Sequence, residues 1–308
     1  MSDASDQKRS IAVSGATGLA GTALVERLTR DGWNVKRLVR REPRRGVGEI
    51  HWDPAADKVD ATGLEGLEAV VHLAGESIAE GRWTAAKKQR ILESRERGTR
   101  LLCEALAGLA RPPKTLLSAS AIGFYGNRGD ELLREESATG EGFLADVCRR
   151  WEAATAPAAE AGVRVVNMRL GVVLSKRGGA LAKMHTPFKL GVGGVLGSGQ
   201  QYMSWIALDD LIAAMLFLLD DASLAGPVNL VAPEAATNRQ FTKALGRALR
   251  RPTILPMPSF AARLAFGEMA DEMLLSSTKV APERLSEAGF SFQYGDLDAA
   301  LEHVLQDR

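Results

Sequence analysis

The sequence has few cysteines and no long apolar run. Its 308 residues include two cysteines, Cys103 and Cys148, and four histidines without the spacing of metal ligands. Both cysteines fall in helical patterns, which predicts buried, reduced thiols, a cytoplasmic location and no metal site. The longest apolar stretch, residues 211–219, is far too short to span a bilayer. We therefore expect neither a disulfide-stapled nor a membrane-spanning protein.

The chain also has almost no net charge. Its 39 Lys and Arg nearly balance its 38 Asp and Glu, for a formal net charge of +1. Such a balance predicts no nucleic-acid or membrane partner. We expect a small-molecule substrate and a monomer or a homodimer. The chain contains no Gly-x-Ser-x-Gly elbow and no Walker A loop, which excludes the hydrolase and NTPase chemistries that need them. The polar residues 1–9 predict a disordered tail with no signal peptide.

What the sequence does contain is a glycine turn at residues 10–21, SIAVSGATGLAG. An apolar run predicts a buried strand before the turn, and a helical pattern follows from Leu19. Gly15 lets the chain reverse, Gly18 lets backbone approach a phosphate, and Gly21 lets the helix pack close to the sheet. The helix start then directs free N–H groups at a pyrophosphate. An ordinary strand–turn–helix corner is the alternative, but the position near the N-terminus favours dinucleotide binding.

Strand-like runs alternate with helical patterns over the first 232 residues. Besides the run before the glycine turn, the predicted strands cover residues 34–39, 49–52, 69–73, 115–118, 163–168 and 228–231. Helices are predicted over residues 90–109 and 143–161, the latter bent or ended at Pro157. This alternation predicts an α/β fold with a doubly wound parallel sheet of about seven strands.

The pattern changes after residue 177. The glycine-rich residues 178–199 predict a mobile loop near a site, and Asp209 is expected to cap a helix that starts near Leu211. Near the C-terminus we expect a short strand over residues 290–294 and a helix from Leu297. The predicted organisation is a nucleotide-binding domain over residues 10–177, completed by 209–232. A smaller α-rich substrate lobe would comprise residues 178–208 and 233–308.

The end of the second strand indicates which nucleotide is bound. NAD enzymes of this architecture place an acidic residue there for the ribose 2′-hydroxyl, but this chain has Arg40 and Arg41. Paired guanidinium groups suit the 2′-phosphate of NADP(H). The alternative is a solvated basic loop, since further arginines follow. Leu73, Ala74 and Gly75, after the next buried strand, would lie beside the adenosine, or would merely form a tight exit from that strand.

Several longer runs resemble a known family. HLAGESIAEGRW, SASAIGFYG, RLGVVLSKRGGAL and GVGGVLGSGQQYMSWIALDDL are similar to the epimerase family proteins. These form a subgroup of the atypical short-chain dehydrogenases and are described as nucleoside-diphosphate-sugar epimerase-like. Residues 250–304 resemble the domain of unknown function that ends this subgroup. The resemblance implies a Rossmann fold that binds NADP(H), without an established physiological reaction.

The resemblance also implies positions for the cofactor. It places Gly15, Thr17, Gly18 and Leu19 around the pyrophosphate, Arg40 and Arg41 at the 2′-phosphate, Leu73 and Ala74 beside the adenosine, Arg95 on a helix that reaches the cofactor, and Val172 near the nicotinamide. For Arg95 the alternative is an ion pair on the helix surface with Glu93 or Glu96.

The chain departs from the superfamily where proton transfer takes place. Extended members use a Ser or Thr together with Tyr-x-x-x-Lys, in which the lysine lowers the tyrosine pKa. Alignment by spacing puts Ala121, Leu144 and Cys148 at these three positions, and no Tyr-x-x-x-Lys occurs anywhere in the chain. The usual set for hydride and proton transfer is therefore absent.

Other side chains are candidates for the chemistry. Tyr125, Ser120 and Glu76 are candidate catalytic groups, although a packing tyrosine and a capping or ion-paired carboxylate are the simpler interpretations. Lys183, Gln200 and Trp205 are candidate substrate contacts, with loop solvation and core packing as alternatives; Tyr202, Asp209 and Trp83 are also considered. The prediction is an NADP(H)-dependent oxidoreductase or epimerase-like enzyme on a small polar or nucleotide-sugar-like substrate. The alternative is a non-catalytic NADP(H)-binding redox sensor or regulatory protein.

Overall fold

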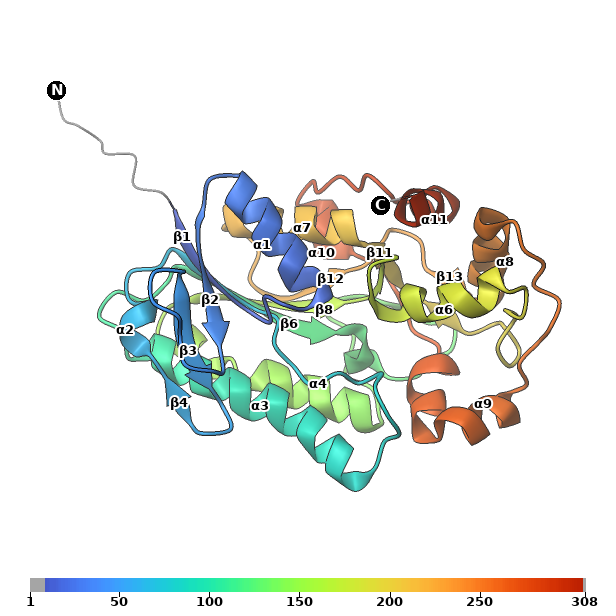
Figure 1. Cartoon of the computed structure of the whole chain (residues 1–308), viewed down its shortest axis with the longest axis horizontal. Helices are drawn as coiled ribbons and strands as arrows, with labels where there is room; N and C mark the ends of the chain where they lie inside the picture. Colours follow the sequence, from blue (N-terminus) through green and yellow to red (C-terminus); the bar gives the residue numbers. More distant parts are fainter. Residues whose placement is uncertain (1–8, 307–308) are drawn as a thin grey trace.

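The computed structural model describes residues 9–306, which form a large sheet covered by helices on both faces (Figure 1). In spatial order its eight strands are β12 (Gly226–Leu230), β8 (Arg164–Leu170), β6 (Thr115–Ala121), β5 (Ala69–His72), β1 (Ser10–Ser14), β2 (Asn34–Val39), β3 (Glu49–Asp53) and β4 (Lys58–Val59). All pairs are parallel except β3–β4. The predicted doubly wound α/β fold is confirmed. Only the two-residue β4 was not predicted.

Each face of the sheet is covered by its own helices. On one face lie α1 (Leu19–Arg30), α7 (Leu208–Asp220) and α10 (Glu283–Glu287); on the other lie α2 (Ala61–Leu64), α3 (Ala85–Ala107), α4 (Phe143–Ala153) and α5 (Ala156–Glu160). Successive residues of β1 supply both cores, because Val13 packs on the α1 side and Ala12 on the α3 side. Pro157 occupies the first turn of α5, where its missing N–H costs nothing, so the predicted helix 143–161 is two helices.

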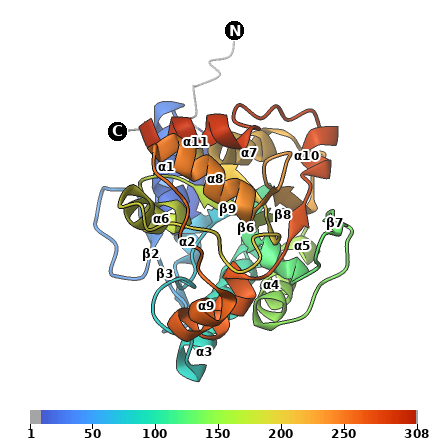
Figure 2. The ribbon, with the colours of Figure 1, turned by 90° about the vertical axis from the view of Figure 1, so that its right-hand side faces the viewer.

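A second group of helices lies at the carboxyl ends of the strands (Figures 1 and 2). It comprises α6 (Gly179–Lys189), α8 (Asn238–Leu249), α9 (Ser259–Phe266), the π-helix η2 (Ala270–Leu274) and α11 (Leu297–Gln306). Three short strand pairs accompany it: β9 (Val172–Leu174) with β11 (Trp205–Ala207), β10 (Tyr202–Met203) with β13 (Ala236–Thr237), and β7 (Leu132–Leu133) with β14 (Lys279–Val280). Helices α6, α8 and α11 share a core of their own.

Three local predictions were wrong. The segment 178–199 is not one loop, since α6 fills half of it. Helix α7 begins at Leu208, so Asp209 lies inside its first turn instead of capping it. Residues 290–294 form no strand, because the backbone N–H groups of Gln293 and Tyr294 donate to the Asp210 carboxylate instead of to a neighbouring strand.

The ends of the described chain need separate mention. Of the predicted tail, residues 1–8 lie outside the described residues. Arg9 is held by ion pairs of 2.9 Å to Glu68 and to Asp220, and its guanidinium stacks on Trp33. No helix within residues 9–306 has both the length and the apolar character to cross a membrane.

The strand order defines where a ligand can bind. From β1 the chain builds outward through β2 and β3, then returns to β5 and builds the other way through β6, β8 and β12. Open sheets of this kind bind ligands in the crevice beyond the carboxyl ends of the strands on either side of the reversal, here β1 and β5.

Candidate functional site

The glycine turn follows β1 at this crevice. Gly15 has φ +65°, and a Cβ on it would lie 2.8 Å from the backbone carbon of Leu73, beyond β5. A Cβ on Gly21 would lie 2.1 Å from the carbonyl oxygen of Gly15, so α1 packs directly on the turn. Gly18 precedes α1 in extended conformation, and no side chain caps the helix. The first N–H groups of α1 are thus available to an anion, and the backbone alone forms the turn.

A buried hydrogen-bond chain fixes the two strand ends against each other. The Ser14 hydroxyl accepts from the backbone N–H groups of Leu73 and Ala74, at 3.0 and 3.2 Å. It therefore donates its own proton to Nδ1 of His72, at 2.7 Å, which leaves Nε2–H to donate to Thr99 at 3.0 Å. Burial lowers the pKa of His72 to about 4, so the ring is neutral at pH 7.

The arginines after β2 are arranged around a carboxylate. Glu49 of β3, with a side chain only 2% exposed, accepts from the guanidinium groups of Arg41 and Arg44 and from the backbone N–H of Arg44. These donors hold the pKa of Glu49 far below its usual range. Arg40 is exposed, and its side chain has no hydrogen-bond or ion-pair partner among the described residues. Two guanidinium groups are thus held together beside a third that points to solvent.

Arg95, on α3, lies next to the loop after β5. Its Nη1 donates to the carbonyl oxygens of Glu76 and Ile91, at 3.0 and 3.1 Å, and its guanidinium lies 4.8 Å from the ring centre of Trp151. A Cβ on Gly75 would lie 3.2 Å from this guanidinium. Arg95 forms no ion pair with Glu93 or Glu96, and Glu96 pairs with Arg150. A half-buried cation, with no contacting carboxylate among the described residues, therefore lies beside the crevice, and desolvation lowers its pKa.

The positions aligned with the family's Ser, Tyr and Lys come together as an apolar surface. Ala121 ends β6, and the N-terminal half of α4 brings Leu144 and Cys148 against the following turn. A Cβ on Gly123 would lie 3.4 Å from the Leu144 Cβ and 3.7 Å from the Cys148 Sγ. Burial raises the pKa of Cys148 to about 12, so the thiol is neutral. Val172 follows β8 and pairs with Trp205 across β9 and β11.

Two predicted catalytic candidates are buried in a polar network instead of facing the crevice. Ser120 is 2% exposed and donates to Glu152 at 2.7 Å; Tyr125 is fully buried and donates to Asn229 at 2.7 Å. Arg169 of β8 holds both, because it forms two hydrogen bonds to Glu152 and one of 2.9 Å to the Tyr125 oxygen. Burial raises the pKa of Tyr125 to about 12. Neither hydroxyl is placed to exchange a proton with a substrate.

Most of the remaining candidate site residues also have partners within the protein. Glu76 pairs with Lys87 at 2.7 Å, which lowers the pKa of its carboxyl. Trp205 is 1% exposed and belongs to the core under α6 and α8, so it is no substrate wall. Gln200 is exposed on the loop before β10, and Asp209 accepts from His303 at 3.0 Å. Of these residues, only Gln200 has an exposed side chain without a hydrogen-bond partner in the described part of the chain.

Lys183 connects the lobe to the part of the chain that contains the glycine turn. Its Nζ, on α6, donates to the carbonyl oxygen of Ala79 in the loop after β5, at 2.6 Å. At the start of α6, Gly178 lies against the side chain of Leu19, the first residue of α1. Helix α6 thus reaches from the glycine turn to the loop after β5, across the crevice between β1 and β5.

The C-terminal segment around η2 contacts α4, on the other side of the crevice. The Glu272 carboxylate, on η2, accepts from the backbone N–H groups of Phe143 and Leu144, at 3.2 and 3.1 Å. Helix α4 has no cap from its own neighbourhood, and Gly142, with φ +108°, leaves the space that the carboxylate fills. Nearby, Lys88 pairs with Glu268 at 2.7 Å. The segment after α9 therefore holds the helix that carries Leu144 and Cys148.

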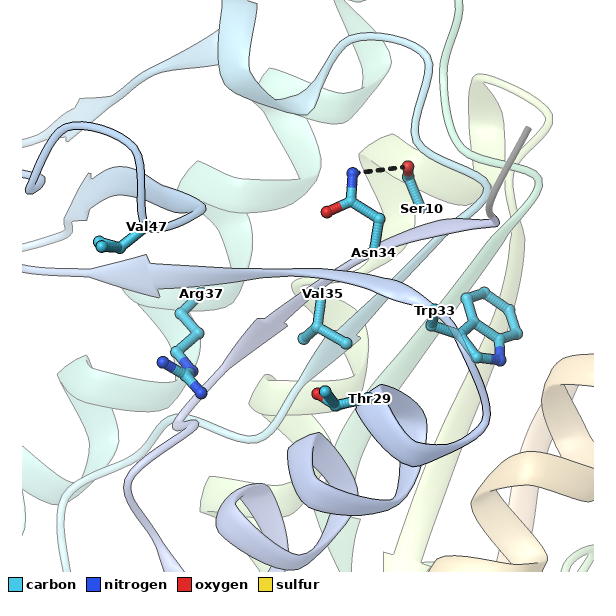
Figure 3. Close-up of a pocket in the computed structure, with 7 residues that line it drawn as sticks. All are labelled: Ser10, Thr29, Trp33, Asn34, Val35, Arg37 and Val47. Atoms are coloured by element: carbon cyan, nitrogen blue, oxygen red, sulfur yellow. Dashed lines mark hydrogen bonds between the residues drawn. The ribbon is translucent and has the colours of Figure 1, made fainter. Parts of the chain in front are cut away.

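The open hollows lie away from the glycine turn. One of about 570 Å³ lies at the amino ends of β1 and β2, where Asn34 donates to Ser10 at 3.2 Å (Figure 3). Another, of about 420 Å³, lies at the starts of α3 and α4, and includes Trp83, whose indole N–H donates to Ile78. Neither of these two hollows includes the predicted cofactor residues.

Three important residues were missed in the sequence. Glu49 and Glu272 are single carboxylates whose partners lie on other elements. Arg169 lies one residue beyond the end of the strand predicted over residues 163–168. A charged residue at the end of an otherwise buried strand is the one signal that could have indicated Arg169, because such a charge needs a partner.

Comparison with known proteins gives a consistent result over the whole chain. The model of the NAD-dependent epimerase/dehydratase family matches residues 11–231, and a domain of unknown function matches residues 257–304. Epimerase family protein MT2273 of Mycobacterium tuberculosis is 46% identical over 296 residues, 96% of this chain and 97% of that protein. Human epimerase family protein SDR39U1 is 36% identical over 298 residues, 96% of this chain and 99% of that protein.

Solved structures support the same family assignment. The crystal structure of human SDR39U1 with NADPH superposes with a TM-score of 0.89 at 34% identity, covering 97% of this chain and all of that one. A nucleoside-diphosphate sugar epimerase from Corynebacterium glutamicum gives 0.79 at 39% identity, covering 97% of this chain and 58% of the other. Together with the glycine turn and the strand order, these matches show that the chain belongs to the NAD-dependent epimerase/dehydratase family.

Proposed function

We propose that the protein is an NADP(H)-dependent oxidoreductase or epimerase-like enzyme that acts on a small polar or nucleotide-sugar-like substrate. The observation that carries this proposal is the uncapped start of α1 next to a turn made only of backbone. When bound, NADP(H) supplies or accepts the hydride. The crystal structure of human SDR39U1 with NADPH supports this choice of cofactor.

The residues around the glycine turn fit NADP(H). Gly15 and Gly18 let the pyrophosphate approach the backbone, and Thr17 and Leu19 complete the turn. Leu73, Ala74 and Gly75 form the opposite wall beside the adenosine, and Val172 lies toward the nicotinamide. A side chain on Gly15 would displace the backbone after β5, so the closeness of the two walls depends on glycine.

Charged side chains would hold the cofactor at two places. Arg40 and Arg41 would bind the 2′-phosphate, with Arg41 oriented by Glu49. Arg95, beside Gly75, would attract the cofactor's negative charge from within the protein. Because burial disfavours its charged form, an anion near Arg95 recovers part of that cost.

Proton transfer would not use a tyrosine–lysine pair. Ala121 and Leu144 cannot exchange protons, and the Cys148 thiol is neutral. This apolar surface favours a second candidate, an NADP(H)-binding protein without turnover that acts as a redox sensor or regulator. The segments 178–208 and 257–275, which close over the crevice, favour the enzyme, because a cofactor-only protein has less need of them.

The test is an incubation of the purified protein with a panel of carbonyl compounds and NADPH, and with nucleotide sugars and NADP⁺, which can accept a hydride from a sugar. Reduced-nicotinamide absorbance is followed together with the identity of the product sugars, and the Arg40→Ala/Arg41→Ala variant is the control. Turnover that the variant lacks at the same cofactor concentration supports the enzyme. Tight NADPH binding without any turnover across the panel favours the sensor, and absence of NADPH binding contradicts both.

A further inference from the structure

Most exposed large apolar side chains of the described residues gather in one region. Ten such side chains are exposed, and eight of them lie between residues 190 and 273. Seven of these define what we call the apolar rim: Leu190, Val192, Ile254, Leu255, Met257, Phe260 and Leu264. Single exposed apolar residues are ordinary on a protein surface, but a group of this size indicates a binding surface.

The apolar rim is continuous because its segments run side by side. The backbone N–H of Met257 donates to Val195 O, and that of Gly197 donates to Met257 O, both at 2.9 Å. A Cβ on Gly194 would overlap the carbonyl oxygen of Leu255. Helix α9 starts directly after this pairing, at the right-hand end of the molecule in Figure 1. Residues 190–197, 254–257 and α9 therefore form one edge of the lobe.

The side chains of the rim protrude instead of lining a groove. Ile254 is 75% exposed, Phe260 71% and Leu264 77%, and the last two lie four residues apart on one face of α9. Pro252, Pro256 and Pro258 punctuate the segment that presents Ile254. Since proline restricts the backbone, little conformational entropy remains to be lost when this segment is immobilised.

The same region is strongly basic. Residues 178–208 and 235–267 contain eight Lys and Arg and no Asp or Glu, although the whole chain has a net charge of only +1. Lys189, Arg250 and Arg251 flank the rim directly and are exposed. Within residues 9–306, neither Lys189 nor Arg250 has an ion-pair partner, and Arg251 donates to the carbonyl oxygen of Lys189. The balanced total charge, from which no membrane partner was predicted, conceals this uneven distribution.

Acidic residues offset two of these eight charges, because Arg247 pairs with Asp298 and Arg263 pairs with Asp271, but they leave Lys189, Arg250 and Arg251 at the rim without an ion pair among the described residues. Glu268 pairs with Lys88, Asp271 pairs with Arg263, and Glu272 caps α4. All three carboxylates are already engaged within the protein. The surface next to the rim therefore presents positive charge together with apolar side chains.

We propose that the apolar rim and its basic border dock on the surface of an anionic lipid bilayer. The apolar side chains enter the acyl boundary, while Lys189, Arg250 and Arg251 contact the anionic headgroups. A second copy of the chain fits less well, because it would bring two basic surfaces together. Surface docking needs no membrane-spanning helix and places the substrate lobe at the membrane, independently of which reaction the crevice supports.

The test measures flotation of the full-length protein with vesicles of phosphatidylcholine alone or mixed with phosphatidylglycerol. We expect binding to the mixed vesicles only, weakened by salt. The Ile254→Ser/Phe260→Ser/Leu264→Ser variant should lose at least about 100-fold in partitioning, since three protruding apolar side chains are removed. Lys189→Glu/Arg250→Glu should lose at least about tenfold.

The matched control is Val47→Ser/Leu132→Ser, which replaces two exposed apolar side chains outside the lobe and should bind vesicles like the parent. NADPH affinity and melting temperature show that each variant is folded. The proposal is wrong if the parent protein does not float with the anionic vesicles, or if the rim variants float equally well. Self-association of the parent without lipid, abolished in the rim variants, would identify a second copy as the partner instead.

Discussion

At the scale of single residues, Arg40 and Arg41 follow β2 directly, and we predict that they distinguish the two nicotinamide cofactors. Each charge-assisted hydrogen bond to a 2′-phosphate contributes roughly 1.5–3 kcal/mol. We therefore expect the Arg40→Ala/Arg41→Ala variant to bind NADPH at least about 100-fold more weakly, while NADH binding changes by less than about threefold. Calorimetric titration with both cofactors measures the two effects.

Arg45→Ala is the matched control for the arginine pair. Arg45 is exposed on the same loop, and its side chain has no interaction with Glu49. If the effect came only from the general charge of the loop, this single substitution would weaken NADPH binding about half as much as the double one. Equal losses for NADH and NADPH in the double variant would contradict recognition of the phosphate.

His72 gives the fold a pH dependence of known sign. Its folded-state pKa of about 4 lies below the ordinary 6.5 of the unfolded chain, so the unfolded state binds the proton first. The stability due to the neutral ring is complete above pH 6.5 and is lost as the pH falls toward 4. The loss amounts to about 3 kcal/mol. Urea unfolding of the parent and of His72→Gln, compared between pH 7 and pH 4.5, measures it.

The His72→Gln variant should be less stable than the parent at pH 7, because the Ser14 and Thr99 hydroxyls lose the imidazole as a hydrogen-bond partner. Its stability should then fall less between pH 7 and pH 4.5. His185→Gln is the control, since that histidine lies on α6, outside the buried chain. An identical pH dependence for the parent and His72→Gln would assign the acid sensitivity to other groups.

Individual residues were predicted well only where the local sequence decides their role. Gly15 was predicted correctly as the residue that lets the chain reverse, and Gly21 as a close-packing position, because the turn and the helix start that need them lie within seven residues. Ser120 and Tyr125 remain untested as proton donors, and the sequence did not predict their burial in a network around Arg169, more than 40 residues away. Nothing near them in the sequence reveals that partner.

At the scale of elements, α4 depends on a cap from a distant segment. The Glu272 carboxylate satisfies two of the first N–H groups of this helix and offsets its dipole. We expect Glu272→Ala to lower the free energy of unfolding by about 1–2 kcal/mol. Amide hydrogen exchange at Phe143 and Leu144 should accelerate, which mass spectrometry of the corresponding peptide can detect.

Asp271→Ala provides the neighbouring control. Asp271 pairs with Arg263 at 2.9 Å, with both side chains about half exposed, and such a surface pair contributes little. Its loss should change stability by less than about 0.5 kcal/mol and leave exchange in α4 unchanged. Equal effects of the two substitutions would mean that η2 as a whole, and not the Glu272 cap, holds α4.

The elements themselves were predicted where burial imposes a simple pattern. The central strands β1 and β5 are buried on both faces, so they were located almost to the residue. β2 was located as well, although only its Leu38 is buried. Helix α6 was missed, because glycines at both of its ends suggested a loop and Pro187 interrupts its pattern. The alternation of aromatic and polar residues at 290–294 predicted a strand. Phe290 and Phe292 instead pack edge to face, with their ring centres 4.8 Å apart.

At the scale of the whole molecule, the crevice is flanked by segments from the middle and from the C-terminal part of the sequence. Lys183 joins α6 to the loop after β5, and Glu272 joins η2 to α4. The sheet supplies the carboxyl ends of β1, β5 and β6, and the lobe covers them (Figure 2). Such contacts between distant segments are not visible in a single sequence, whereas the doubly wound order is, because it follows from the alternation of elements.

This arrangement makes the proposed cofactor a ligand of the folded state as a whole. The glycine turn, the loop after β5 and α6 meet only when the sheet and the lobe are both formed. NADPH at 100 times its dissociation constant should therefore add about 2.7 kcal/mol to the free energy of unfolding and raise the melting temperature by several degrees. NADH at the same concentration should raise it less, and the Arg40→Ala/Arg41→Ala variant should lose the difference. A thermal scan in which NADPH produces no shift would mean that residues 10–21 form a strand–turn–helix corner without a nucleotide.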